Sequence, residues 1–130
     1  MKPKYDYKLP FCTVLIMPKK VLQIAYDPGL LSVRRSLMEA SGYEVATVVG
    51  TADLPNLGLL ALAIDLIVVD HSADFEARWG VVRGLKLRYP ELPVIALRRD
   101  EHEEGISLAD HTPSAHNPTT WLGSIALALL

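Results

Sequence analysis

Two carboxylates follow apolar stretches of the sequence at points where a strand would end. Asp70 comes directly after LIVV, in the stretch DLIVVDHSAD of residues 65–74, and Asp27 follows VLQIAY. An aspartate in such a place can bind a cation or act as a nucleophile, or it can simply cap the next helix. The carboxyl ends of parallel strands meet at one edge of a sheet. We therefore expect Asp27 and Asp70 to share a crevice there, with Asp70 at the rim rather than buried in the sheet.

Other polar residues are weaker candidates for chemistry. Asp70, His71 and Ser72 have the composition of a hydrolytic triad, but neighbours on an extended segment point in opposite directions and cannot make the required contact. A later polar segment contains His102, Asp110, His111 and His116. Their spacing matches no recognised metal-ligand pattern, so we interpret them as solvated loop residues. The stretch DPGLL contains a single glycine, so a glycine-rich phosphate loop has no support.

The elements that must position these residues alternate between strands and helices. Apolar segments typical of strands occupy residues 19–27, 44–50, 65–70 and 92–98. Segments with helical spacing occupy residues 28–41, 52–63 and 73–89, and a final helix carries an apolar face of Trp121, Leu122, Ile125 and Leu129. Strands that are apolar on both faces and separated by helices indicate a parallel sheet covered on both sides. The expected fold is a doubly wound α/β domain.

The apolar spacing also predicts which helix faces meet the core. In the first helix the apolar residues at helical spacing are Leu30, Val33, Leu37 and Ala40. In the helix at 73–89 they are Phe75, Trp79, Val82 and Leu85 or Lys86. We interpret these faces as core, and the two aromatic residues as packing rather than a recognition surface.

Length and composition restrict the class of protein. The chain has 130 residues, of which 50% are hydrophobic and 22% charged, as expected for one globular domain. Its formal net charge is -2, with acidic and basic residues interspersed, which gives no electrostatic basis for binding nucleic acid or an anionic membrane. The lone Cys12 cannot form an internal disulfide, which suits a cytoplasmic location.

The sequence shows neither a membrane span nor a secretion signal. The longest apolar region, LGLLALAIDLIVV, contains Asp65 and is shorter than the roughly twenty apolar residues of a span. The opening residues lack a long apolar segment followed by a cleavage site. Met17 begins MPKKVL, a typical start just before a strand, so residues 1–16 are interpreted as an upstream extension of the reading frame. We divide the chain into an N-terminal extension, residues 1–18, and one domain, residues 19–130.

Between about Val21 and Leu97 the sequence resembles the receiver domain of bacterial two-component response regulators. The stretches VLQIAYDPGLLSVRRSLMEASGYEV, DLIVVD and LRYPELPVIAL follow the family pattern in order. The resemblance implies a flavodoxin-like sheet of five parallel strands in the order 2-1-3-4-5. It also places Asp70 at the position of the aspartate that accepts a phosphoryl group from a histidine kinase.

Several site positions depart from that family pattern. The acidic pair with which receivers hold Mg²⁺ is replaced by Ala25 and Tyr26, followed by Asp27. At the phosphate site, Arg98 stands in place of a small hydroxyl residue and Asn117 in place of a lysine. The sequence therefore agrees with the family in the segments that form the fold, but not in the residues that carry the phosphoryl chemistry.

The loops depart from the pattern as well. The proline and glycine that shape the loop after the phosphoacceptor in receivers are replaced by Asp74 and Arg78. The segment of residues 98–118 is shorter than typical and contains no convincing helix of full length. We expect a short or missing fourth helix, and residues 99–117 as the least regular part of the domain.

These departures favour a degenerate receiver. Phosphoryl transfer needs a metal ion and a cationic side chain to neutralise the transferring group, and Asp70 alone supplies neither. Asp27 and Asp70 together are expected to hold Mg²⁺ only weakly. Arg98 either pairs with Asp70 through two hydrogen bonds, which would lock the switch in one state, or points into solvent with Arg99.

We interpret the chain as a stand-alone receiver-like signalling domain of the two-component phosphorelay type. It is expected to be no enzyme, to need no cofactor beyond weakly bound Mg²⁺, and to act through a protein partner. That partner would be a histidine kinase, a downstream signalling protein or a second copy in a homodimer. The alternative is a phosphorylatable receiver with Asp70 as phosphoacceptor and Asp27 helping to bind Mg²⁺. A third interpretation is a flavodoxin-like domain that binds a small ligand in the crevice.

Overall fold

The computed structural model describes residues 18–50, 58–59 and 61–130. Within these residues the chain forms the strands β1 (Lys20–Ala25), β2 (Glu44–Val49), β3 (Leu66–Val69) and β4 (Val94–Ala96). The helices are α2 (Pro28–Ala40), α3 (Phe75–Arg88) and α4 (Pro118–Ala128). Strands and helices thus largely alternate along the chain, as predicted for a doubly wound α/β domain.

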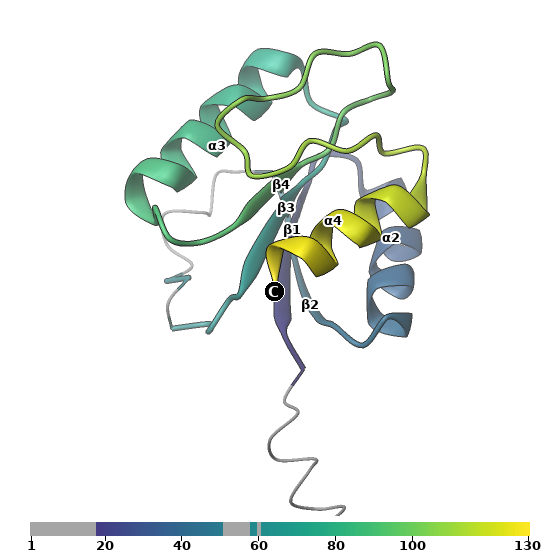
Figure 1. Ribbon diagram of the computed structural model, residues 1–130, viewed down its shortest axis with the longest axis vertical. Helices are drawn as coiled ribbons and strands as arrows, with labels where there is room; N and C mark the ends of the chain where they lie inside the picture. The colour runs from purple at the N-terminus through teal and green to yellow at the C-terminus, as the bar shows by residue number, and fades with distance from the viewer. Residues whose placement is uncertain (1–17, 51–57, 60) are drawn as a thin grey trace, which may run out of the picture.

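The strands form one parallel sheet in the order β2-β1-β3-β4 (Figure 1). Ile24 of β1 pairs with Val48 of β2 and with Val69 of β3, and Val69 pairs in turn with Ala96 of β4. Because all pairs are parallel, the carboxyl ends of the strands lie at one edge of the sheet. The predicted order 2-1-3-4 is confirmed for these strands.

Helices cover both faces of the sheet, so the core has two layers (Figure 1). The layer beneath α3, which we call the α3-side core, includes Leu22, Ile24, Ile67, Val69, Val82 and Leu85. The layer beneath α2 and α4, the α4-side core, includes Val21, Met38, Leu66, Val68, Trp121 and Ile125. Successive strand residues point to opposite faces, so every central strand contributes to both layers. The predicted apolar face of the final helix is confirmed at Trp121 and Ile125.

Helix α2 buries a different face from the predicted one. Its buried residues are Arg34 and Met38, whereas Val33 is 63% exposed and Leu30 is 37% exposed. The inward face is therefore rotated by one residue, or about 100°, from the predicted stripe. Leu37 alone of the predicted stripe packs at the margin of the α4-side core. The prediction for this face was wrong because an arginine, not a valine, lies inward.

Helix α3 follows its prediction more closely. Val82 and Leu85 are buried, and Phe75 and Trp79 are partly buried against the α3-side core. Arg78 is buried on the same helix, which the apolar pattern did not indicate.

The fifth predicted strand is present only as a short extended segment beside β4. Isolated parallel bridges join Ile95 to His111 and Arg98 to Ser114. Residues 97–117 contain turns and bends but no helix. The prediction of an irregular segment with a missing fourth helix is therefore confirmed.

Two predictions fall largely on residues that the structure does not describe. Of the helix predicted at 52–63, residues 59 and 61–63 form turns, and most of the others lie outside the described residues. Residues 1–17 of the predicted extension also lie outside them. Within the described part of the chain, no helix is both long and apolar enough to cross a membrane.

Candidate functional site

Asp70 follows β3 directly and is drawn into the edge of the sheet. Its backbone N–H donates to the carbonyl of Ile24 in β1 at 2.8 Å, which continues the ladder by one residue. No part of Asp70 is exposed to solvent. The expectation that Asp70 lies at an open rim was wrong. A buried carboxylate needs partners that compensate for its lost hydration.

Arg34 of α2 is the charged partner of Asp70. Its Nη1 donates to Asp70 Oδ1 at 2.7 Å, and the two side chains are only 7% and 0% exposed. The hydroxyl of Ser72 donates to Oδ2 of the same carboxylate. His71 lies alongside, with its Nδ1 3.1 Å from Oδ1. Both oxygens of Asp70 are thus engaged from within the domain.

These contacts keep Asp70 ionised. Burial alone would raise the pKa of Asp70, but the contacts from His71 and Ser72 and the charge of Arg34 outweigh burial. The pKa of Asp70 therefore lies well below its usual range. At neutral pH the site holds a complete internal ion pair.

Arg98, the cation that we expected at this site, is used elsewhere. Its Nε donates to the carbonyl of Thr112 at 2.6 Å, and its Nη1 donates to the carbonyls of Glu101 at 3.2 Å and Glu103 at 3.3 Å. The guanidinium therefore ties the end of the sheet to the segment that follows β4. Neither predicted arrangement of Arg98, paired with Asp70 or pointing into solvent, is found, because these backbone carbonyls lie within its reach.

The two positions that the resemblance matches to the acidic pair of receivers carry no carboxylate. Ala25 is fully buried at the end of β1, and Tyr26 packs partly buried against the α3-side core. The Tyr26 hydroxyl is buried and has no hydrogen-bond partner among the described residues. Burial raises the pKa of Tyr26, and the nearby charge of Arg78 opposes that rise. A neutral ring therefore occupies this part of the crevice.

Asp27 and Asn117 both lie at helix N-termini. Oδ1 of Asp27 accepts a hydrogen bond from the Gly29 N–H at 2.9 Å and caps α2. Oδ1 of Asn117 accepts from the Thr120 N–H at 3.3 Å and caps α4. Asp27 does follow a strand at the same edge of the sheet as Asp70, as predicted. Its carboxylate caps helix α2. Helix capping is the alternative to cation binding that the sequence left open.

A second buried arginine fastens the segment after β4. Arg78 is 1% exposed and donates two hydrogen bonds to Glu103, from Nη1 to Oε1 at 3.1 Å and from Nη2 to Oε2 at 2.6 Å. Arg78 also donates to the carbonyls of Ala73 at 2.9 Å and Leu97 at 3.1 Å. Glu103 accepts a further bond from the Arg99 N–H at 2.6 Å. We call this group the Arg78–Glu103 clasp, because it joins α3, the end of β4 and the segment beyond.

The described residues fit a magnesium ion poorly. Among them, no group of three or more His, Cys, Asp or Glu side chains is placed to hold a metal ion. The oxygens of Asp70 are engaged by Arg34 and Ser72, and one oxygen of Asp27 by Gly29. Mg²⁺ requires near-octahedral oxygen ligation, which this arrangement does not offer. The Arg34 guanidinium supplies the positive charge at Asp70 instead.

Solved structures with the same arrangement of strands and helices are response regulator receiver domains. One from Clostridium thermocellum superimposes with a TM-score of 0.72 and 21% identity, over 85% of this chain and 94% of the other. The response regulator protein TrrA from Thermotoga maritima, in complex with Mg(2+)-BeF, gives a TM-score of 0.71 and 16% identity, over 86% and 99% of the two chains. The chemotaxis response regulator CheY4 of Vibrio cholerae gives 0.64 and 21%, over 87% and 100%.

This chain therefore has the fold of response regulator receiver domains, across nearly the whole length of the solved relatives. No protein-family model matches the sequence, and no curated protein matches it significantly. At identities of 16–21% the likeness concerns the fold, so the chemistry of the site must be argued from this chain's own residues.

Proposed function

We propose that this chain is a receiver-like signalling domain of the two-component type that acts through contacts with a protein partner and is phosphorylated weakly or not at all. The buried pair of Arg34 and Asp70 carries this proposal. A phosphoacceptor must present a carboxylate oxygen to the incoming phosphorus atom. Here both oxygens of Asp70 are engaged, and the residue has no exposed surface.

The distribution of positive charge supports the same proposal. Phosphoryl transfer requires cations on the oxygens of the transferring group. The Arg34 guanidinium already neutralises Asp70, the Arg98 guanidinium binds backbone carbonyls, and Asn117 is neutral. These three positions leave no free cation for a phosphoryl group. A domain that the Arg34–Asp70 ion pair holds in one state fits this geometry better than a domain that switches on phosphorylation.

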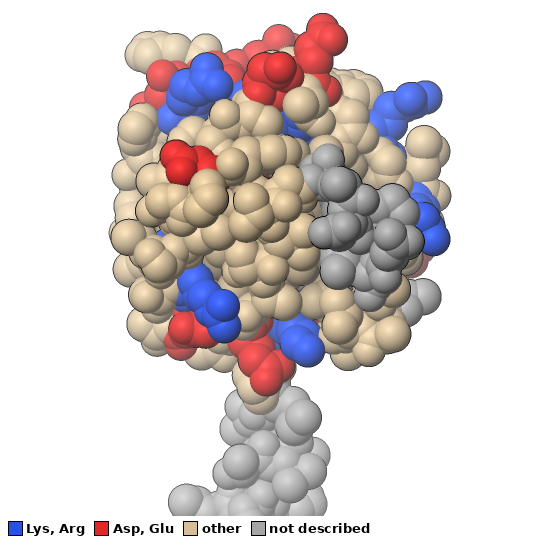
Figure 2. All heavy atoms as spheres, turned by 180° about the vertical axis from the view of Figure 1, so that it is seen from behind, with Lys and Arg blue, Asp and Glu red and all other residues tan. Residues whose placement is uncertain are grey.

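A protein partner fits the surface better than nucleic acid does. On the face shown in Figure 2, the coloured Lys and Arg side chains are scattered, while acidic side chains gather at the upper edge. A continuous basic surface, which phosphate backbones require, is not seen among them. The solved complex of TrrA with the histidine kinase ThkA supports a kinase or a downstream signalling protein as the class of partner. A homodimer is a second arrangement, and the proposed location is the cytoplasm.

Incubation with acetyl phosphate and Mg²⁺, followed by intact mass, tests this proposal. We expect the unmodified chain to gain no phosphoryl mass over a period in which TrrA, as a positive control, is modified. The Asp70→Asn variant gives the background of modification at other residues. A phosphoryl gain as large as that of TrrA, and absent from the Asp70→Asn variant, would overturn the proposal.

That outcome would establish the alternative, a receiver in which Asp70 accepts the phosphoryl group and Asp27 helps to bind Mg²⁺. Two observations favour this alternative: Asp70 is ionised, as a nucleophilic carboxylate must be, and Asp27 follows the neighbouring strand at the same edge. It requires Arg34 to leave Asp70. A magnesium titration that follows the amide shifts of His71 and Ser72 separates the two. We expect binding at millimolar concentrations or weaker, and tighter binding favours the alternative.

A further inference from the structure

An apolar pocket lies at the end of the sheet opposite to Asp70. Its volume is about 330 Å³, and it is lined by Leu59, Ile64, Arg88, Tyr89, Pro90, Glu91 and Leu92. Ile64 and Leu92 each precede the first residue of a strand by two positions, in β3 and β4. The pocket therefore opens at the amino ends of the strands and has no part in the Asp70 site.

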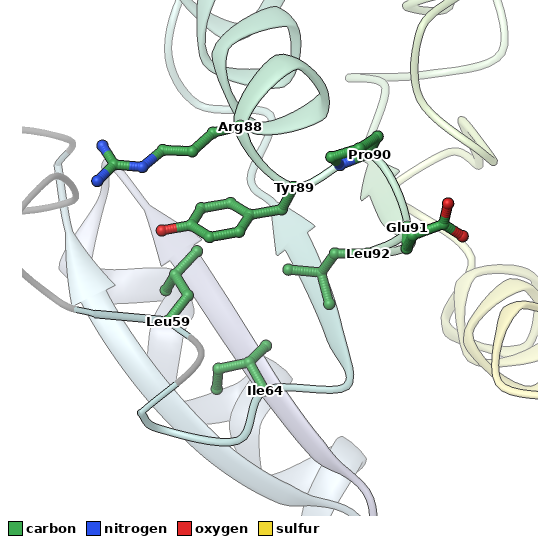
Figure 3. Close-up of a pocket in the computed structure, with 7 residues that line it drawn as sticks. All are labelled: Leu59, Ile64, Arg88, Tyr89, Pro90, Glu91 and Leu92. Carbon is green, nitrogen blue, oxygen red and sulfur yellow. The ribbon is translucent and has the colours of Figure 1, made fainter.

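Apolar side chains make up most of the lining of this pocket, which also includes the charged residues Arg88 and Glu91. Figure 3 shows Leu59, Ile64 and Leu92 and the ring of Tyr89 directed toward a common space. The Glu91 carboxylate points away from that space (Figure 3). Water in such a pocket would find few polar partners, and a volume of this size corresponds to about ten waters at ~30 Å³ each. An apolar occupant is favoured because it would displace this poorly bonded water.

The chain enters the sheet beside the pocket. Lys20, the first residue of β1, donates its N–H to Asp65 Oδ2 at 2.8 Å, and the Asp65 N–H donates to the carbonyl of Lys20 at 2.8 Å. Asp65 is the neighbour of Ile64 in the pocket wall. Adjacent strands lie about 4.8 Å apart, so the start of β1 is within roughly 10 Å of the pocket. The described chain therefore begins, at residue 18, at the same end of the sheet as the pocket.

The segment that precedes β1 is apolar enough to occupy this pocket. Residues 9–17 read LPFCTVLIM and contain no charged side chain. An extended chain spans at most about 3.3–3.6 Å per residue, so residues 11–17 reach about 25 Å, more than the distance required. Phe11, Val14 and Ile16 offer side chains that match the apolar wall. We propose that residues 9–17 fold back over the amino ends of β3 and β4 and occupy this pocket within the same molecule.

This proposal makes the segment part of the folded domain, in contrast to the interpretation of residues 1–16 as an upstream extension of the reading frame. It does not depend on the phosphorylation state of Asp70. Cys12 is the only cysteine of the chain and lies within the proposed occupant, so a nitroxide spin label can be attached there without other changes. In the full-length labelled chain, we expect the NMR signals of Ile64, Tyr89 and Leu92 to lose most of their intensity. Signals of Arg99 and His102, at the opposite end of the sheet, should keep theirs.

Variants within the segment distinguish docking from mere proximity. The pair Val14→Asp and Ile16→Asp places charges in the proposed occupant, and we expect it to restore the signals of Ile64 and Leu92. The pair Tyr5→Asp and Tyr7→Asp introduces the same number of carboxylates outside residues 9–17 and should leave the loss unchanged. None of these substitutions falls in residues 18–130, so the sequence of the strands and helices is unchanged.

Three results would overturn the proposal. One is full signal intensity at Ile64 and Leu92 in the unmodified labelled chain. Another is an equal loss in the Val14→Asp, Ile16→Asp pair. The last is a loss of equal size when isotope-labelled chains without nitroxide are mixed with nitroxide-labelled chains, since the occupant would then belong to a second copy.

Discussion

The charge of Asp70 at the centre of this site is balanced by the side chain of Arg34. Arg34 and Asp70 are both buried, and their ion pair replaces the hydration that each group loses on folding. Breaking one half of such a pair is costly because the other charge remains buried without a partner. The ion pair therefore stabilises the fold as well as forming part of the site.

We predict that Arg34→Met lowers the free energy of unfolding by about 3–5 kcal/mol, the cost of an unpaired buried charge. Adding Asp70→Asn should recover part of this loss, since it removes the unpaired carboxylate. The neighbouring Arg35→Met is the matched control. Arg35 and Glu39 are 49% and 47% exposed in an i,i+4 pair, so the change should cost at most about 0.5 kcal/mol. Urea unfolding measures all four proteins, and equal losses for Arg34→Met and Arg35→Met would contradict the prediction.

The Arg78–Glu103 clasp should make stability depend on acid pH. Hydrogen bonds from Arg78 lower the pKa of Glu103 to about 2, whereas an unfolded glutamate titrates near 4.3. A depressed pKa stabilises the fold above the unfolded value, and the stabilisation is lost as pH falls from about 4.3 toward 2. We expect Glu103→Gln to be less stable than the unmodified chain at pH 7, and the difference to shrink through this range. Glu104→Gln, at the exposed neighbour, is the control, and a difference that does not vary with pH would count against the prediction.

At the scale of elements, residues 97–117 are held by specific contacts although they contain no helix. A Cβ at Gly105 would clash with the side chain of Thr112, so the chain passes very close to itself here. Asp110, within the segment, accepts further hydrogen bonds from Lys86 of α3 and from the Val94 N–H of β4. The segment is irregular in backbone conformation and closely packed.

Two glycine substitutions test this close approach. Gly105→Ala should lower the thermal midpoint, because the added methyl group meets the Thr112 side chain. Thr112→Ala in the same chain should restore part of the loss. Gly80→Ala is the matched control: nothing lies within 4 Å of its Cβ, and it sits in the middle of α3. It should raise stability by about 0.5–1 kcal/mol through helix propensity alone. A midpoint for Gly105→Ala equal to that of the unmodified chain would show that the segment adapts freely.

The same elements show what a sequence can and cannot reveal. Strand order, helix α3 and the missing fourth helix followed from apolar periodicity and the family resemblance. The inward face of α2 and the partner of Asp70 did not, because apolar periodicity gives no sign of a buried arginine such as Arg34 or Arg78. Each lies four residues before a buried apolar residue, Met38 or Val82, and so on the same helix face. Buried arginines are exceptions to the usual preference, and only their paired carboxylates explain them.

At the scale of the whole molecule, one sheet supports both core layers. Trp79 packs against the α3-side core and Trp121 lies in the α4-side core, and the chain has only these two tryptophans. The central strands contribute to both layers, so neither layer can lose its packing while the sheet persists. The domain should therefore unfold as one cooperative unit.

Single-tryptophan variants test this cooperativity. Trp79→Phe leaves a probe in the α4-side core, and Trp121→Phe leaves one in the α3-side core. We expect each variant to show the same urea midpoint by fluorescence and by far-ultraviolet circular dichroism, although the two variants can differ in stability. If either fluorescence transition precedes the loss of helix signal, the layers unfold separately.

The bridged segment beside β4 has a consequence for behaviour at high protein concentration. A strand from another molecule can add to a sheet edge only where it finds an unbroken row of free N–H and C=O groups. Here the segment meets β4 at the isolated bridges of His111 and Ser114, and the carbonyl of Thr112 between them already accepts a hydrogen bond from Arg98 Nε. This side of the sheet is therefore a poor template for strand addition, and it protects the domain against edge-to-edge aggregation.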